Sequence, residues 1–185
     1  MPDATGLELL AQELREAHPD SVLDTEHFRD KGALEVEPAT IGDVLAFLKA
    51  RGYTFMASLH GVDYYPHEPR LGVLYEMLDR QRVERISVKA RLHTDDPRID
   101  SVVDLFPSAD FQERETYDMF GVIFEGHPDL RRILMPEDYE GYPQRRDFPV
   151  GGEPILFTEH AAQGTDYTLG TNVADPERLA TTGEH

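Results

Sequence analysis

One segment, residues 113–148, constrains the fold of this chain more than any other part of the sequence. It reads ERETYDMFGVIFEGHPDLRRILMPEDYEGYPQRRDF, so charged residues are interleaved with aromatic and aliphatic ones along its whole length. Ions that lie among apolar groups and away from water must be paired, because an unpaired buried charge is strongly disfavoured. The segment therefore predicts ion pairs that are held in a water-poor contact.

The absence of cysteine and the net charge exclude several classes of protein. The 185 residues include no cysteine, so the chain forms no disulfide and lacks the thiolate ligands that iron–sulfur clusters normally require. The formal net charge of −18 disfavours contact with nucleic acid or with anionic membranes. Such an acidic surface serves solubility or salt adaptation, or it recognises a basic partner. The charge alone does not separate these two interpretations.

The sequence shows neither a membrane span nor a secretion signal. No apolar run approaches the length of about 20 residues that a membrane-spanning helix needs. The N-terminus MPDATGLELL lacks the basic start and the apolar core of a signal peptide. We therefore expect a cytoplasmic protein.

Two helices and five strands are predicted in the first part of the chain. Apolar residues recur at helical spacing over residues 7–17 and 41–51, each time behind a capping residue. Five segments have the composition of strands, namely residues 21–28, 33–37, 53–59, 71–78 and 86–92. We expect a bulge or bend at Gly61 and a central place in the sheet for residues 71–78. The order α-β-β-α-β-β-β predicts a two-layer α+β fold, a mixed β-sheet with helices on one face.

A third helix is expected between Ser108 and Gly121. Its apolar residues spread around much of the circumference, whereas a helix that rests on one sheet keeps them on one side. This distribution indicates a helix that is covered from two sides, so that its charged residues must be paired. We expect Arg114 to pair with Asp110 or Asp118, each one helical turn away. The other interpretation is an ordinary surface helix with exposed ion pairs.

An extended C-terminal arm is expected to follow this helix. Residues 126–154 contain five prolines and four glycines, which prevent long regular structure. A segment of this kind is disordered or is ordered by lying on a partner, and we expect the second. The pattern predicts an α+β domain over residues 1–106, the helix and the arm over 107–149, and an acidic extended tail over 150–185.

Four arginines form a basic cluster in this arm: Arg131, Arg132, Arg145 and Arg146. The planar guanidinium group matches carboxylates and phosphates with two parallel hydrogen bonds. Neither GxGxxG nor GxxxxGKS/T, the common phosphate-binding motifs, occurs in the sequence. The arginines are therefore expected to bind carboxylates of a partner protein.

The segment also resembles the signature of one protein family. The matching residues, in chain order, are Glu113-Arg114-Glu115, Asp118-Met119-Phe120, His127, Arg131-Arg132-Ile133-Leu134, Pro136-Glu137-Asp138-Tyr139, Gly141-Tyr142-Pro143 and Arg145-Arg146-Asp147-Phe148. This pattern is similar to that of the C subunit of NADH–quinone oxidoreductase, the thirty-kilodalton subunit family of respiratory complex I. We call residues 113–148 the signature segment. The order of helices and strands before it also resembles the family's fold.

The resemblance implies a structural subunit that binds no cofactor and performs no chemical step. FMN and the iron–sulfur clusters, which carry electrons from NADH to quinone, would belong to partner subunits of this proton-translocating complex. The chain would lie in the peripheral part of complex I, on the cytoplasmic side of the cell membrane, and pack against the D subunit, a large neighbour that helps to form the quinone cavity. The residues that it assigns to the interface or to anchoring of the arm are Glu113, Arg114, Glu115, Asp118, His127, Arg131, Arg132, Pro136, Asp138, Arg145, Arg146 and Asp147.

Two alternatives reinterpret the signature segment. A small enzyme would use Glu113, Asp118 and His127 as acid–base groups and Arg131 as an anion anchor. The equivalent subunit of a membrane-bound hydrogenase, or of a dehydrogenase with another electron donor, would carry the same signature. The first alternative differs from the complex I interpretation in the chemistry of the chain, and the second differs in the partner proteins.

A metal site is the third alternative. His60, Asp63 and His67 have spacings of three and four residues, which would align them on a helix. Their surroundings alternate as a strand does and lead into a turn with two prolines. We therefore expect these three side chains not to converge.

Overall fold

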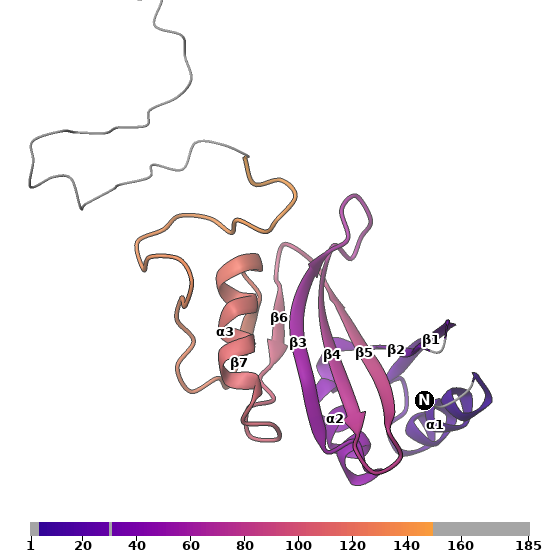
Figure 1. Cartoon of the computed structure of the whole chain (residues 1–185). Helices are drawn as coiled ribbons and strands as arrows, with labels where there is room; N and C mark the ends of the chain where they lie inside the picture. The colour runs from indigo at the N-terminus through magenta and orange to yellow at the C-terminus, as the bar shows by residue number, and fades with distance from the viewer. Residues whose placement is uncertain (1–3, 30, 150–185) are drawn as a thin grey trace, which may run out of the picture. The chain divides into compact units, whose positions relative to one another are not determined.

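The computed structural model describes residues 4–29 and 31–149. Within these ranges the helices are α1 (Ala4–Ala17), α2 (Ile41–Ala50) and α3 (Ala109–Phe120), and a short 3-10 turn, η1 (Pro38–Thr40), precedes α2. The strands are β1 (Val22–Phe28), β2 (Lys31–Val36), β3 (Phe55–Asp63), β4 (Leu71–Asp79), β5 (Glu84–Leu92), β6 (Arg98–Asp100) and β7 (Ile123–Glu125). Figure 1 shows β3, β4 and β5 side by side, with α3 next to β3.

The chain divides into two compact units near the end of the described residues. The first unit extends to Phe148 and contains every helix and strand named above, and the second begins at Pro149. The acidic tail expected over residues 150–185 lies outside the described residues. In the described ranges, no helix combines the length and the hydrophobicity that a bilayer crossing demands.

Five strands form one mixed sheet in the order β1-β2-β5-β4-β3. The β2–β5 pair is parallel, and the other neighbouring pairs are antiparallel. β4 lies between β5 and β3, as its continuously apolar sequence predicts for an interior strand. The predicted α+β fold with a mixed sheet is therefore confirmed.

One hydrophobic core joins the sheet to the first two helices. On β4 the side chains of Leu71, Val73, Tyr75 and Met77 are fully buried, and the residues between Val73 and Met77 that point the other way are partly exposed. The two helices add an apolar stripe each, made of Leu7, Ala11, Leu14, Ile41, Val44, Leu45 and Leu48. The helical period that predicts both elements is what gathers these side chains on one side of each helix.

Two short strands that the sequence does not predict hold both ends of α3. β6 precedes the helix, β7 follows it, and the two pair in parallel. Each strand has three residues, which is too short for an alternating pattern to be recognised. Their buried members, Ile99 and Phe124, belong to the main core. The beginning and the end of α3 are thereby tied to the same part of the domain.

The prediction of a bulge or bend at Gly61 is wrong. β3 continues through this glycine to Asp63, and its irregular register lies earlier, between Met56 and Ser58. Gly61 has a different reason to lack a side chain, because a Cβ atom there would collide with the ring of Phe120. The glycine therefore lets the C-terminal end of α3 approach the edge strand closely.

This contact predicts that Gly61→Ala destabilises the chain by about 1–3 kcal/mol, the usual cost of forcing extra volume into a packed site. The matched control is Gly42→Ala in α2, where a Cβ atom would meet nothing within 4 Å. Alanine in that helical position is expected to add about 0.5–1 kcal/mol of stability. Urea unfolding followed by circular dichroism measures both changes, and equal effects of the two substitutions would contradict the proposed contact.

Candidate functional site

α3 is covered on nearly all of its circumference. Among its residues only Phe111 and Glu115 are exposed, whereas Glu113 and Asp118 are 0% exposed and Arg114 is 7% exposed. The main-chain N–H of Leu59 on β3 donates to the side chain of Gln112, so the helix also covers the edge of the sheet. The expectation of a helix covered from two sides is confirmed, and the second cover is the C-terminal arm, residues 126–148, of the same chain.

α3 ends at Gly121, and the arm folds back over that position. Gly121 has φ 76°, in the left-handed region that glycine adopts without strain, and its N–H donates to the carbonyl of Tyr117. A Cβ atom on it would lie 2.5 Å from the ring of Tyr142. The backbone conformation and the close approach of the arm therefore both require glycine here.

Glu113 fastens α3 to the loop that precedes it. Its carboxylate accepts hydrogen bonds from the hydroxyl of Ser101, at 2.6 Å, and from the main-chain N–H of Val102, at 2.8 Å. Burial raises the pKa of Glu113, and these two bonds offset part of that increase. The carboxylate lies inside the domain and has the role of a structural anchor.

Asp118 organises the first half of the arm. One oxygen of its carboxylate accepts the main-chain N–H groups of Ile133, Leu134 and Met135, at 3.0, 2.7 and 2.8 Å. The other oxygen accepts a hydrogen bond from the guanidinium of Arg132 at 2.7 Å. Burial opposes the charge, but the backbone donors and Arg132 outweigh it and lower the pKa of Asp118. Asp118 therefore stays ionised and fixes the path of three successive residues.

Arg114 does not pair with either of the expected partners. Its guanidinium donates to the main-chain carbonyls of Arg131, at 3.2 Å, and of Arg132, at 3.3 Å. The prediction of an ion pair with Asp110 or Asp118 is wrong, because the returning arm places backbone carbonyls over the helix and brings Arg132 to Asp118. Spacing along one helix cannot reveal a donor that arrives from another segment.

His127 holds the beginning of the arm. Its ring is fully buried, and Nδ1 accepts the main-chain N–H of Asp129 at 3.0 Å. Nε2 therefore carries the proton, and it donates to the carbonyl of Asp110 at 3.2 Å. The distance from Nε2 to the Glu113 carboxylate is 4.0 Å. The histidine thus links the arm to the first turn of α3.

The last part of the arm is bound at two places. Arg145 donates to the carbonyl of Phe120 at 2.6 Å and stacks over the ring of Tyr142. Arg70, which is 8% exposed, donates to the carboxylates of Asp63 and of Asp147. Arg70 lowers the pKa of both acids through these bonds. The contacts that shape the arm in this structure therefore come from its own chain, whereas the sequence predicts that a partner orders it.

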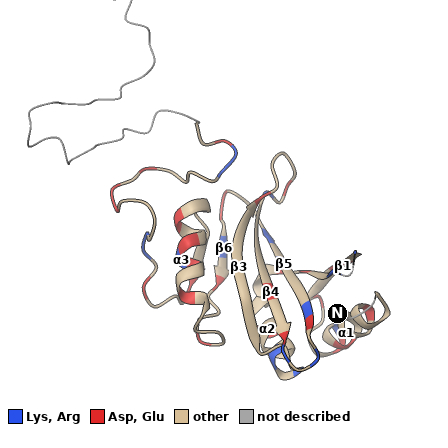
Figure 2. Ribbon diagram, in the orientation of Figure 1, with Lys and Arg blue, Asp and Glu red and all other residues tan. Residues whose placement is uncertain are grey.

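The remaining predicted residues lie on the surface. Arg131 pairs with Asp129 at 2.8 Å, and both side chains are more than half exposed. Glu115, Asp138 and Arg146 are exposed, and their side chains have no hydrogen bond or ion pair within the described part of the chain. Pro136 follows the three residues that Asp118 binds and is also exposed. Figure 2 shows acidic positions along α3 and basic positions on the arm beside it.

The acid–base groups and the anion anchor of the alternative in which the chain is a small enzyme do not lie together in one open site. Glu113 and His127 come together, but both side chains are 0% exposed. Asp118 is occupied by the arm, and Arg131 lies outside with Asp129. In the described residues, no three His, Asp or Glu side chains are grouped so that they hold a metal ion.

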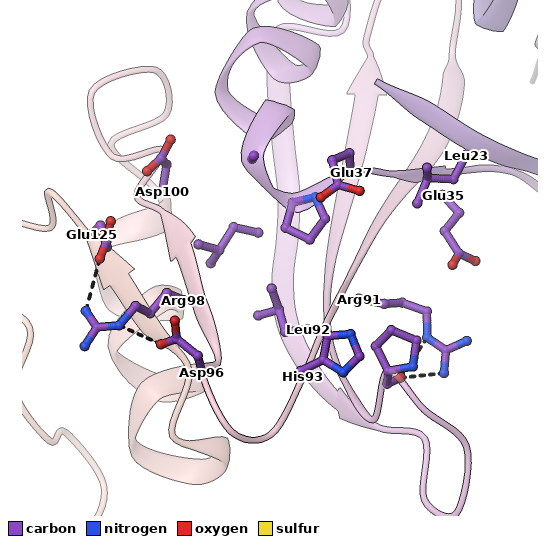
Figure 3. Close-up of a pocket in the computed structure, with 14 residues that line it drawn as sticks. Leu23, Glu35, Glu37, Arg91, Leu92, His93, Asp96, Arg98, Asp100 and Glu125 are labelled. Atoms are coloured by element: carbon purple, nitrogen blue, oxygen red, sulfur yellow. Dashed lines mark hydrogen bonds and ion pairs between the residues drawn. The ribbon is translucent and has the colours of Figure 1, made fainter. Parts of the chain in front are cut away.

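Several hollows interrupt the surface that the described residues form, and two of them lie beside α3 or its flanking strands. The larger of these two, of about 610 Å³, lies between β5 and the β6–β7 pair (Figure 3). Its guanidinium groups are occupied, because Arg98 pairs with Asp96 and Glu125 and Arg91 donates to a main-chain carbonyl. The charge of Arg98 is therefore balanced by two carboxylates, and Arg91 is held in place by the Pro69 carbonyl. The smaller, of about 280 Å³, is enclosed by β3, α3 and the arm.

Sequence and structure comparisons relate the chain to known proteins. The family model described as "Respiratory-chain NADH dehydrogenase, 30 Kd subunit" matches residues 34–154. The C subunit of NADH-quinone oxidoreductase from Roseiflexus sp. (strain RS-1) is 43% identical over 161 residues, which cover 85% of this chain and 90% of that protein. NADH-quinone oxidoreductase subunit 5 of Thermus thermophilus is 45% identical over 124 residues, which cover 62% of this chain and 60% of that protein.

Two solved structures have the same fold. A trypsin-resistant fragment (1–134) of Nqo5 has a TM-score of 0.59 and 33% identity, over 67% of this chain and 98% of the fragment. A chain of the membrane-bound sulfane sulfur reductase, an archaeal respiratory membrane complex, has a TM-score of 0.66 over 89% of this chain and 93% of that one. The second match has 24% identity and is a likeness of fold alone.

The buried contact of Asp118 predicts a large effect of Asp118→Asn. The amide nitrogen of asparagine would oppose the guanidinium of Arg132, and this largely buried arginine would lose its charge partner at a cost of about 3–5 kcal/mol. The arm is then expected to open at least about 100-fold more often, since 1.4 kcal/mol corresponds to tenfold. Trypsin cleavage after Arg131 and Arg132 measures this opening. The control Asp138→Asn, an exposed acid of the same arm, is expected to leave cleavage unchanged, and similar rates for both variants would contradict the role of Asp118.

The lowered pKa of Asp118 also predicts how the arm responds to acid. Its pKa in the folded chain lies below the ordinary value of 3.8, so its contribution to stability is present above about pH 4. That contribution is lost only as the pH falls through the lowered folded value. The amide resonances of Leu134 and Met135 in an NMR titration are therefore expected to stay constant down to about pH 4 and to move below it. A midpoint at or above the ordinary value would refute this assignment.

Proposed function

Because this chain belongs to the family of the 30 kDa subunit of respiratory-chain NADH dehydrogenase, we propose that it is a structural subunit of NADH–quinone oxidoreductase, complex I. In this proposal the chain binds no redox cofactor, and FMN and the iron–sulfur clusters belong to other subunits. The absence of cysteine in all 185 residues supports it. The transfer of electrons from NADH to quinone is then the work of the whole complex.

The observation that carries the proposal is the way in which α3 and the arm are built. The buried charged residues of the signature segment are bonded within the chain, where they hold α3 and the arm on the domain. What faces outward is a set of apolar side chains, with Phe111 62%, Ile133 37% and Leu134 61% exposed. In this proposal another protein covers these apolar side chains, which the backbone of α3 and of the arm holds in place before binding. We assign the role of docking region to residues 107–149.

The D subunit of the complex is the partner that we propose for this surface. The outward-facing residues of the signature segment, Glu115, Arg131, Asp138 and Arg146, are the proposed contacts with it. The residues that fix the arm, Asp118, Arg132 and Arg145 among them, act on the same contact by positioning it. A permanent interface of this type buries more than about 2,000 Å² in total. The proposed location is the cytoplasmic side of the membrane, reached through the complex.

A second candidate function is the equivalent place in a related respiratory complex. The fold likeness to a chain of the sulfane sulfur reductase, with a TM-score of 0.66, favours keeping this candidate. The two candidates differ in the proteins that surround the chain. A flavin- and NADH-binding subunit in the same assembly supports complex I, and a different electron-input module supports the alternative.

Purification of the tagged full chain from membranes of its host tests the proposal. We expect the subunits of an NADH–quinone oxidoreductase, the D subunit among them, in constant proportion as measured by mass spectrometry. Arg145→Ala removes the bond to the Phe120 carbonyl, which costs about 1.5–3 kcal/mol for a charged donor, and is expected to lower the yield of intact complex several-fold. Arg80→Ala, which changes an exposed arginine in the turn between β4 and β5, is the control. A chain that purifies alone would refute the proposal, and an unchanged yield with Arg145→Ala would refute the role of the arm.

A further inference from the structure

The charged residues of the signature segment divide into those that the fold uses and those that it leaves free. Glu113, Asp118 and Asp147 accept hydrogen bonds inside the chain, as described above. On α3 the exposed carboxylate is that of Glu115, which has no hydrogen bond or ion pair within the described residues. A glutamate without a bond on this largely covered helix is available to a partner.

Glu115 lies in the wall of the smaller hollow. This groove, of about 280 Å³, is lined by His60 and Gly61 of β3, by Glu115 and Phe120 of α3, and by Leu134 of the arm. Its walls are mainly apolar, and Glu115 is the carboxylate among the lining residues. Leu134 is 61% exposed at the rim, so the apolar surface continues outward from the groove. The groove therefore combines mainly apolar walls with one negative charge, that of Glu115.

The groove is held in shape before any partner arrives. Asp118 fixes the main chain of Leu134 through a 2.7 Å hydrogen bond, and the absence of a side chain at Gly61 lets Phe120 close the opposite wall. A site that needs no rearrangement loses less conformational entropy on binding. The same contacts that build the arm therefore also preorganise the groove.

We propose that this groove receives one basic side chain, arginine or lysine, from the partner subunit. This inference rests on the function proposed above and specifies the chemistry of its contact. When the partner covers the surface, Glu115 loses water, and an unpaired carboxylate there is strongly disfavoured. Arginine and lysine carry a cation on an aliphatic stem, so the stem packs against Phe120 and Leu134 while the cation pairs with Glu115. The net charge of −18 of the chain attracts a basic partner surface to the same place.

The test measures binding of the full chain to the purified D subunit of the same organism. Glu115→Gln keeps the shape of the side chain and removes its charge, and is expected to raise Kd by about tenfold or more. Glu115→Lys is expected to weaken binding further, and the loss on Glu115→Gln is expected to shrink as the salt concentration rises. The control is Glu16→Lys, the same reversal at an exposed position of α1, with an expected change below about twofold. Circular dichroism of each variant verifies that it is folded.

A photo-cross-linking residue at Gln144, an exposed position that also lines the groove, identifies the occupant directly. A cross-link to a segment of the D subunit that contains an arginine or lysine at the contact supports the proposal. A cross-link to the chain's own tail or to a second copy would overturn it, as would unchanged binding of Glu115→Lys to the D subunit. In those cases the wild-type chain still binds its partner, so the proposed function stands. No binding of the wild-type chain to the D subunit would overturn both.

Discussion

The carboxylate of Asp118 is the interaction on which the second half of this structure depends. It is buried, and it accepts three consecutive main-chain N–H groups and one guanidinium. An ion in this place is stable only because all of these donors converge on it, so the arm has one path over α3. Once that path is set, the carbonyls of Arg131 and Arg132 lie above the helix, where Arg114 binds them. The ion pair and the course of the backbone therefore determine each other.

Two close contacts at glycine residues also hold α3 and the arm in place. Gly61 brings the end of α3 to the edge of the sheet, and Gly121 lets Tyr142 pack over the C-terminus of the helix. At the far end Arg70 joins Asp63 to Asp147, which are separated from Arg70 by 7 and 77 residues. The arm is thus attached to the domain at its beginning, middle and end. Each attachment uses a polar or charged side chain that is bound within the chain.

The way in which the charged residues are used supports the proposal that this chain is a structural subunit of a larger assembly. The buried acids and arginines of the signature segment have partners inside the chain, so they stabilise a surface. The residues left over, Glu115 and Arg146 with the apolar Phe111 and Leu134, are the ones that such a surface presents. The chain belongs to the family of the 30 kDa subunit of respiratory-chain NADH dehydrogenase, and its 185 residues contain no thiolate ligand for an iron–sulfur cluster.

The sequence by itself determined the elements with a clear period and the family. α1, α2 and the interior place of β4 follow from the spacing of apolar residues, and the signature segment carries the family resemblance. The tertiary structure decided which charges meet, because Arg114 and Asp118 find their partners on a segment that is distant in sequence. It also decided the role of Gly61 and the pairing of β6 with β7, which depend on contacts across the fold. Periodicity records which side of an element is buried, whereas the identity of a partner depends on the three-dimensional path of the chain.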